Sequence, residues 1–180
     1  MGRTVFNTSV LCASVMVATA HVASAQFSPP AAANVTIGGK TVSVRYSAPS
    51  VRGRKIFGAG GLLSRDPTYP AWRAGANAAT AFRTDADLDV GGLAVPRGSY
   101  TLYVWVMNPD AWELIINRQT GQSGLEYNAS LDLGRVKMTM ARPPALVETL
   151  KYTLTDKGGG KGELRIEWEQ HTGTVPLAVK

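Results

Sequence analysis

The sequence predicts an all-β domain, an antiparallel β-sandwich or flattened barrel of about eight to ten strands with one long ordered loop. Three observations carry this prediction. Short runs of alternating polar and apolar residues recur along the chain, turn residues separate them at intervals of about 8 to 12 residues, and no run of ten residues has the period of an amphipathic helix. Residues 74–81 have room for one or two helical turns at most.

The first strands are expected in two hairpins with paired glycines at their tips. Residues 38–39 separate the β-rich runs 35–37 and 40–46, and residues 91–92 divide the run 88–95 in the same way. Glycine at both central positions suits the tight turns that need positive φ angles. Each pair of runs therefore predicts two adjacent antiparallel strands.

The later runs predict the rest of the sheets. Residues 100–107 are long and mostly apolar, as expected of a central strand, and residues 112–117 follow after an Asn-Pro-Asp turn. Three glycines at 158–160 separate the runs 150–155 and 163–169. Alternation places the following residues on inward faces: Val136, Met138 and Met140 of one run, and Leu164, Ile166 and Trp168 of another.

Residues 1–25 have the pattern of a secretory signal peptide. Arg3 gives a short positive start, residues 10–20 form a run of small and apolar residues, and an Ala-Ser-Ala site ends at Ala25 before Gln26. We therefore expect cleavage near Ala25-Gln26 and a periplasmic or secreted protein. The apolar run is too short for a bilayer-spanning helix, and no later run is longer, so no membrane span is expected.

Residues 26–33 are expected to be a flexible lead-in and residues 34–180 a single β-sandwich domain. Cys12 is the only cysteine of the chain and falls within the signal. Leu11 stands where a lipoprotein signal would have a small residue, which disfavours a lipid anchor. Without another cysteine, the processed domain has neither a disulfide nor a thiol, so its stability must come from a packed core.

Enzyme chemistry based on histidine or cysteine is largely excluded by count. His171 is the only histidine outside the signal, and we expect it on the surface, in a turn before the last strand. A cluster of histidine and cysteine ligands is therefore impossible, and a serine-histidine-aspartate triad lacks a recognisable nucleophile turn. We predict no cofactor, no metal and no catalytic residue.

Three alternating aspartates, Asp85, Asp87 and Asp89, leave open a calcium site with oxygen ligands. Their spacing resembles the start of an EF-hand loop, but the later glycine and bidentate acid of that loop are missing. Alternation in a strand would place the three carboxylates on one exposed face, and this is the preferred interpretation.

Positive charge is concentrated in residues 45–83. This segment has seven lysines and arginines and one acid, whereas the rest of the processed chain has 11 cations and 12 acids. The cations either are solvated and paired with neighbouring strands, or form an electropositive pocket for an anionic ligand. Nucleic-acid binding is disfavoured because the chain carries an export signal and lacks a nucleic-acid motif.

The same segment contains the side chains that a site for a small anionic or polar ligand would use. Arginine grips carboxylate or phosphate with a planar fork, aromatic rings supply contact area, and amides and hydroxyls orient a ligand. Each residue also has a structural interpretation, in which it packs in the core or bonds loop carbonyls. The candidate ligand-binding residues are Tyr46, Ser47, Arg52, Arg54, Trp72, Arg73, Asn77 and Thr80.

Four motifs make the chain resemble the bacterial family called domain of unknown function 2911. They are Y-S-A-P-S-V-R-G-R-K-I-F-G from residue 46, W-R-A-G-A-N-A-A-T from residue 72, P-R-G-S-Y-T-L from residue 96 and W-E-L-I-I-N from residue 112. The resemblance implies an exported single domain and transfers no reaction. Asp132 and Arg135 fit the D-x-x-R-V pattern of the family. The chain departs from it at Ser123-Gly124, where tryptophan-glycine is common, and in a longer link over residues 59–71.

Three functions remain open at this stage. The first is a non-catalytic exported domain that binds a small anionic or polar ligand, a sugar or envelope fragment, through residues 46–80. The second is a structural or protein-interaction module of the cell envelope, in which the same motifs brace the long loop. The third is an enzyme that uses Tyr46 or Ser47 with an arginine-stabilised anion, and it would need a base such as Asp132 or Glu126 from a distant strand. Oligomeric state has no sequence signal.

Overall fold

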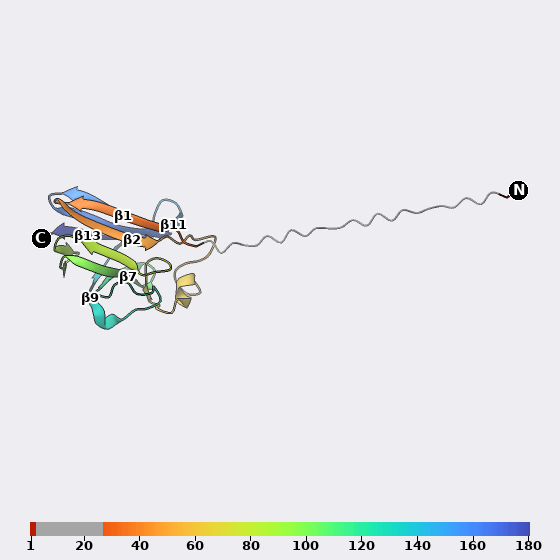
Figure 1. The fold of residues 1–180 in the computed structure, drawn as a ribbon, viewed down its shortest axis with the longest axis horizontal. Helices are drawn as coiled ribbons and strands as arrows, with labels where there is room; N and C mark the ends of the chain where they lie inside the picture. Colours follow the sequence, from red (N-terminus) through yellow and green to blue (C-terminus); the bar gives the residue numbers. More distant parts are fainter. Residues whose placement is uncertain (3–26) are drawn as a thin grey trace.

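The computed structural model describes residues 1–2 and 27–180 of the chain (Figure 1). The predicted signal peptide, apart from its first two residues, lies outside the described residues, and so does Cys12. Within the described ranges, no helix is long and apolar enough to cross a membrane.

Two antiparallel sheets pack face to face and do not close into a barrel. The strand order in the seven-stranded sheet is β1-β2-β4-β7-β8-β9, with β3 also paired to β7. Its strands are β1 (Pro30–Ile37), β2 (Lys40–Ser47), β3 (Ala71–Trp72), β4 (Thr80–Thr84), β7 (Gly98–Asn108), β8 (Ala111–Asn117) and β9 (Asp132–Lys137).

The six-stranded sheet has the order β11-β12-β13-β5-β6, with β10 also paired to β13. Its strands are β5 (Leu88–Val90), β6 (Leu93–Val95), β10 (Thr139–Ala141), β11 (Val147–Gly158), β12 (Lys161–Glu169) and β13 (His171–Val179). Two short 3-10 helices, η1 (Leu62–Arg65) and η2 (Ala129–Leu131), lie in connections. Figure 1 shows η1 at the end of the sandwich where the chain enters β1, and the C-terminus at the other end.

The β-sandwich predicted from alternation is confirmed, together with the hairpins at residues 38–39, 91–92 and 158–160. Nine of the described strands have five residues or more, as expected. Four further strands have only two or three residues, which is too few for alternation to be recognised. The run from Arg135 to Ala141 is divided between β9 and β10, which belong to different sheets.

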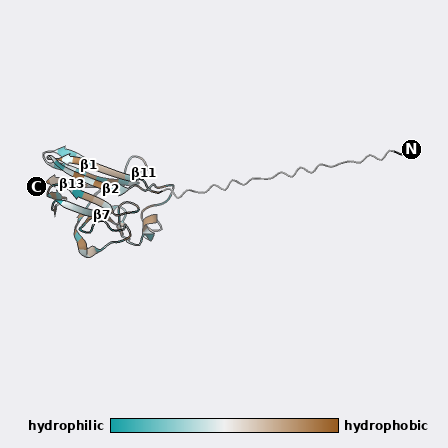
Figure 2. Ribbon diagram, viewed as in Figure 1, coloured by the Kyte–Doolittle hydropathy of each residue, from teal (hydrophilic) through white to brown (hydrophobic). Residues whose placement is uncertain are grey.

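The core lies between the sheets and is rich in aromatic side chains. Trp72, Trp112 and Trp168 are each 1% exposed, and the rings of Trp72 and Trp168 stack with centroids 5.4 Å apart. Phe57, from the loop after β2, packs against all three. Figure 2 shows hydrophilic and hydrophobic residues mixed along the strands, as expected when one face of each sheet is buried.

The lead-in predicted at residues 26–33 is too long. Strand β1 begins at Pro30, and its first four residues pair with Val44 to Ser47 at the far end of β2. The start of this strand has prolines and small residues and so gives no strand pattern in the sequence. It pairs with β2 through backbone groups, which do not depend on the side chains.

The prediction of a surface turn at His171 is wrong. The residue opens β13, is 6% exposed, and stacks on Trp112 with ring centroids 5.9 Å apart. The reason is the register of the β12–β13 hairpin, in which His171 lies directly opposite Trp168. Residues directly opposite each other in an antiparallel pair share a face, so the imidazole follows the indole into the core.

Candidate functional site

The long loop, residues 48–79, connects β2 to β4 and forms most of the candidate site. Its first part docks on β11 by backbone bonds from Val51 N to Glu148 O (2.7 Å) and from Leu150 N to Pro49 O (2.9 Å). The Glu169 carboxylate then accepts Ile56 N at 2.8 Å. These bonds satisfy loop backbone groups that burial would otherwise leave unpaired, so the loop is ordered without regular structure.

The second half of the long loop is fixed by short β-pairing and by hydroxyl groups. Strand β3 places Trp72 against β7. The carbonyl of Ala74 accepts the hydroxyls of Thr80 (3.1 Å) and Tyr152 (2.8 Å). Burial, the largest effect, and the nearby Tyr46 raise the pKa of the Tyr152 hydroxyl well above its usual value, so it remains a donor.

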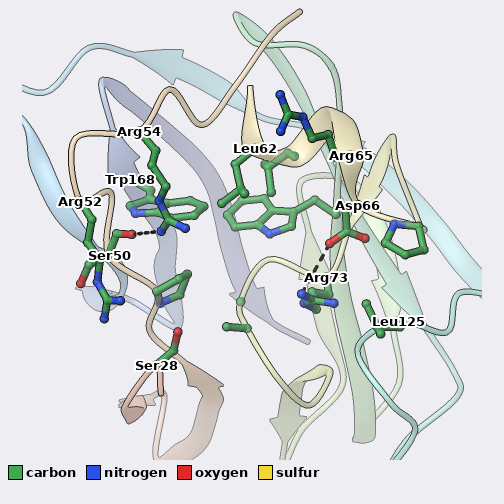
Figure 3. Close-up of a pocket in the computed structure, with 16 residues that line it drawn as sticks. Ser28, Ser50, Arg52, Arg54, Leu62, Arg65, Asp66, Arg73, Leu125 and Trp168 are labelled. Carbon is green, nitrogen blue, oxygen red and sulfur yellow. Dashed lines mark hydrogen bonds and ion pairs between the residues drawn. The ribbon is translucent and has the colours of Figure 1, made fainter. Parts of the chain in front are cut away.

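A cavity of about 390 Å³ lies between the two halves of the long loop, at the end of the sandwich (Figure 3). We call it the arginine cavity because Arg52, Arg54, Arg65 and Arg73 line it with a single acid, Asp66. Figure 3 shows Arg52 and Arg54 on one side and the other three residues opposite them. Four cations facing one anion give the cavity an excess of positive charge.

Arg54 bonds its own loop while it lines the cavity. Its Nε donates to Val51 O at 2.9 Å, and its Nη2 donates to Ser50 O at 2.6 Å. Its third nitrogen, Nη1, makes no hydrogen bond within residues 27–180. The side chain therefore braces the loop through the Nε–Nη2 edge of the guanidinium and leaves Nη1 unbonded in this part of the chain.

Arg73 is more enclosed. Its Nη2 lies 3.5 Å from the Asp66 carboxylate, and the side chains are 18% and 9% exposed. Thr68 donates both its backbone N–H and its hydroxyl to the same carboxylate. Within the described residues, the Nε and Nη1 atoms of Arg73 are buried without a hydrogen-bond partner. Buried guanidinium nitrogens without partners are energetically costly.

The segment after β8 closes over Arg73. A Cβ atom added to Gly124 would lie 2.5 Å from Arg73 Cδ and would also clash with the carbonyl of Asn77. An isolated bridge pairs Ala78 with Ser123 next to this contact. The glycine is therefore required by close packing, and it brings Leu125 to the mouth of the cavity.

The structure divides the eight sequence-predicted residues into two groups. Arg52, Arg54, Trp72 and Arg73 line the arginine cavity, whereas Tyr46, Ser47, Asn77 and Thr80 do not. Tyr46 accepts the backbone N–H of Tyr152 at 3.1 Å, and the Ser47 carbonyl accepts Ala76 N. Asn77 has φ 61° and donates weakly to Ser28 O at 3.5 Å. Ser47 and Thr80 therefore hold the long loop on the sheet, whereas Tyr46 links β2 to β11 and Asn77 links the loop to Ser28.

Sequence reasoning missed several residues that line the cavity: Ser28, Leu62, Leu63, Arg65, Leu125 and Trp168. Arg65 had a signal, since it belongs to the basic segment, but nothing distinguished it from neighbouring cations. Leu125 and Trp168 come from distant segments, and alternation predicts for Trp168 only that it faces inward. Their approach to the cavity depends on how the sheets pack.

The structure does not assemble the base that the enzyme hypothesis requires. Asp132 begins β9, which is separated from β2 and Tyr46 by β4, β7 and β8, or about 19 Å at the usual strand spacing. Glu126 is exposed, and it is its backbone carbonyl that accepts the Tyr103 hydroxyl. Neither carboxylate is among the hydrogen-bond partners of Tyr46 or Ser47 in the described part of the chain.

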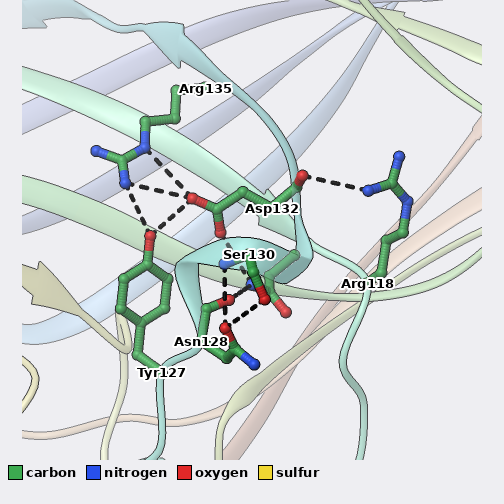
Figure 4. Close-up of polar contacts among 7 residues, drawn as sticks. Arg118, Tyr127, Asn128, Ser130, Asp132 and Arg135 are labelled. Atoms are coloured by element: carbon green, nitrogen blue, oxygen red, sulfur yellow. Dashed lines mark hydrogen bonds and ion pairs between the residues drawn. The ribbon is translucent and has the colours of Figure 1, made fainter.

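Asp132 instead organises a closed polar network with Asn117, Tyr127 and Arg135. Figure 4 shows Tyr127 and Arg135 beside the Asp132 carboxylate. Its carboxylate accepts the Asn117 amide at 2.9 Å and the Tyr127 hydroxyl at 2.7 Å. Arg135 donates to that hydroxyl at 2.9 Å and lies 4.6 Å from the centre of the Trp105 ring. Burial and the Asp132 hydrogen bond raise the pKa of Tyr127 to about 12. We call this cluster the Asp132 network.

Burial alternates along residues 85–89 as predicted, although only Asp89 of the three aspartates lies within a strand, β5. Asp85 and Asp87 are exposed and Asp89 is half-buried. They bind separate partners: Arg83, the backbone N–H of Arg97, and Lys180. Residues 27–180 contain no group of three or more histidine, cysteine, aspartate or glutamate side chains arranged to hold a metal ion.

Comparison with known proteins identifies a family and no closer relative. Neither the search of curated proteins nor the search of solved structures finds a significant match. The model of the family described as "Protein of unknown function (DUF2911)" matches residues 28–177, which include the whole long loop and both sheets. The chain therefore belongs to the DUF2911 family.

Proposed function

We propose that this protein is an exported, non-catalytic β-sandwich that binds a small anionic ligand in the arginine cavity. The observation that carries the proposal is the lining itself, in which four arginines and one aspartate surround about 390 Å³. Cavities of this size fall at the lower end of the range used for small molecules. Export is supported by the signal pattern of residues 1–25 and would place the protein in the periplasm or outside the cell.

The incomplete bonding of the arginines supports an anion rather than a neutral ligand. Arg54 keeps Nη1 unbonded, and Arg65 is exposed without a hydrogen bond or ion pair in the described chain. A carboxylate or phosphate between them would form charge-assisted hydrogen bonds, which are about twice as strong as neutral ones. The gain is larger inside a partly enclosed cavity than on an open surface.

Two measurements test this proposal. Native mass spectrometry of protein taken from its own cells should detect a retained small molecule. Isothermal titration with glucuronate and with glycerol 3-phosphate should give saturable binding, and the double variant Arg52→Gln/Arg65→Gln should weaken it about tenfold, the loss expected when a charge-assisted bond is removed. Arg97→Gln removes an exposed arginine outside the arginine cavity and should leave binding unchanged.

The second candidate is a structural or protein-interaction module of the cell envelope. It is favoured by the hydrogen bonds that Arg54 and Thr80 donate to carbonyls of the long loop, which brace the loop whether or not a ligand is present. A bare mass together with no binding of either anion would overturn the first proposal in favour of this one. Arg73→Ala and Asn77→Ala would then act on stability alone.

A further inference from the structure

Exposed hydrophobic side chains gather at the mouth of the arginine cavity. Leu62 is 38% and Leu125 is 52% exposed, and both line the cavity. Phe27, 85% exposed, directly precedes Ser28, which also lines it. The described chain exposes three other large hydrophobic side chains, those of Met1, Met107 and Leu146. Single exposed hydrophobics are ordinary, but two exposed leucines in the lining of one cavity give its rim apolar surface that an occupant could cover.

The apolar surface continues from the mouth into the cavity. Leu63 of η1 is buried, and it lines the cavity together with Trp72 and Trp168. Figure 3 shows Leu62 between the two groups of cations, with Leu125 on the side of Arg73. Leucine side chains therefore lie beside the arginines in the lining of the cavity.

Neutral hydrogen-bonding side chains are few in this lining. Within the described residues they are the hydroxyls of Ser28 and Ser50 and the indole N–H groups of Trp72 and Trp168. Both tryptophans are only 1% exposed, and the Ser50 hydroxyl is already paired with that of Thr149 at 3.1 Å. A sugar needs several neutral donors and acceptors for its hydroxyl groups, because buried hydroxyls without partners are costly. The combination of cations with leucines fits an anionic head and an apolar tail better.

We propose that the ligand is an anionic amphiphile, a carboxylate or phosphate attached to a single alkyl or acyl chain of medium length. This inference rests on the proposed anion-binding function and narrows it. Nη1 of Arg54, together with Arg65, binds the head, and Leu62, Leu63 and Leu125 contact the chain. The volume of about 390 Å³ suits one short chain rather than a two-chain lipid.

The test is a chain-length series of alkanoates from acetate to decanoate, each kept as a monomer in solution. Burial of a methylene group contributes about 0.8 kcal/mol, so the dissociation constant should fall two- to fourfold per added methylene until the cavity is filled. Octyl phosphate should bind like octanoate, and octanol should bind at least tenfold more weakly because it lacks the charge. Titration calorimetry measures the affinities, and Trp72 and Trp168 provide a fluorescence signal from the lining.

A matched pair of variants tests where the alkyl chain of the ligand binds. Leu125→Ser should flatten the dependence on chain length while acetate binding stays the same. Leu146→Ser changes a leucine of similar exposure, 49%, that does not line the cavity, and should leave the whole series unchanged. Both substitutions fall on exposed side chains, so both variants are expected to fold.

The outcomes separate this inference from the proposed function. If glucuronate and glycerol 3-phosphate bind but affinity does not change along the alkanoate series, the proposal of an amphiphilic ligand is wrong and the proposal of an anion site is supported. If octanol binds as tightly as octanoate, or if no probe binds, both are wrong. A third outcome would also overturn the inference: the protein sediments with phosphatidylglycerol vesicles but binds no monomeric alkanoate saturably. The ligand would then be a bilayer surface.

Discussion

The arginine cavity and the Asp132 network are both built around an arginine–aspartate pair, but only the network is closed. In the network, Asp132 accepts from Asn117, Tyr127 and Arg135, and the Tyr127 hydroxyl both donates and accepts. In the cavity, the pair of Arg73 with Asp66 is longer, at 3.5 Å, and leaves two guanidinium nitrogens without partners in the described chain. A closed network stabilises the fold, whereas an open one keeps bonding capacity for another molecule.

The largest effect that tests this comparison is expected within the network. Asp132→Ala should lower the free energy of unfolding by about 3 kcal/mol, because it leaves the Asn117 amide and the Tyr127 hydroxyl without their acceptor. Asp110→Ala is the control, since Asp110 also pairs with an arginine at 2.7 Å but is 67% exposed, against 12% for Asp132. Its effect should stay within about 0.5 kcal/mol. Urea unfolding measures both, and equal losses would contradict the distinction.

In the cavity the corresponding change should be smaller and should be reversible by a second substitution. Arg73→Met keeps the packing of the stem but leaves the Asp66 carboxylate buried without a cation, at a cost of about 2 kcal/mol. Adding Asp66→Asn removes that charge and should recover most of the loss. A double variant that is as unstable as Arg73→Met alone would show that the guanidinium is structurally essential, as in a closed network.

The two roles of Arg54 can be separated by a conservative change. Arg54→Lys keeps the positive charge but has no planar fork to reach both Ser50 O and Val51 O, so it should destabilise the protein by about 1 kcal/mol. Binding of glycerol 3-phosphate, corrected for stability, should weaken less than in Arg54→Gln. Equal weakening in the two variants would mean that the charge of Arg54 makes no contribution to binding.

The smallest expected effect is a pH dependence of the free energy of unfolding, caused by His171 near the long loop. Burial lowers the pKa of His171 below its usual 6.5, although Glu169, 3.2 Å away, opposes the shift. The unfolded chain therefore takes up a proton before the folded protein does, and the free energy of unfolding should fall as pH decreases below about 6.5. His171→Phe should flatten this part of the stability profile, and an unchanged slope would assign it to other groups.

Much of the fold could be predicted because it depends on local pattern. Alternation located the long strands, and paired glycines located the hairpin between β1 and β2, whose turn has positive φ at both Gly38 and Gly39. The site was only partly predictable. Arg52, Arg54 and Arg73 stood out by charge, but the apolar rim did not, since Leu125 reaches the cavity only when the segment after β8 packs on the long loop.

The two errors have a related cause. The depth of His171 follows from its register opposite Trp168, and the early start of β1 follows from backbone pairing with β2. Both are long-range properties of a sheet that residue type alone does not encode. Tyr46 and Thr80 do not line the arginine cavity: the Tyr46 hydroxyl accepts the backbone N–H of Tyr152 in β11, and the Thr80 hydroxyl donates to Ala74 O in the long loop.

The lining of the arginine cavity runs from Ser28, beside the first strand, to Trp168, near the end of β12. Contacts between residues so far apart in the chain form slowly, because the entropy of closing a large loop is lost before the contacts add any stability. The cavity therefore comes into existence only after nearly the whole domain has been synthesised and its two sheets have docked. A nascent chain or a fragment would lack the cavity and could not bind such a ligand. Bound ligand would therefore be a sign that the domain has folded completely.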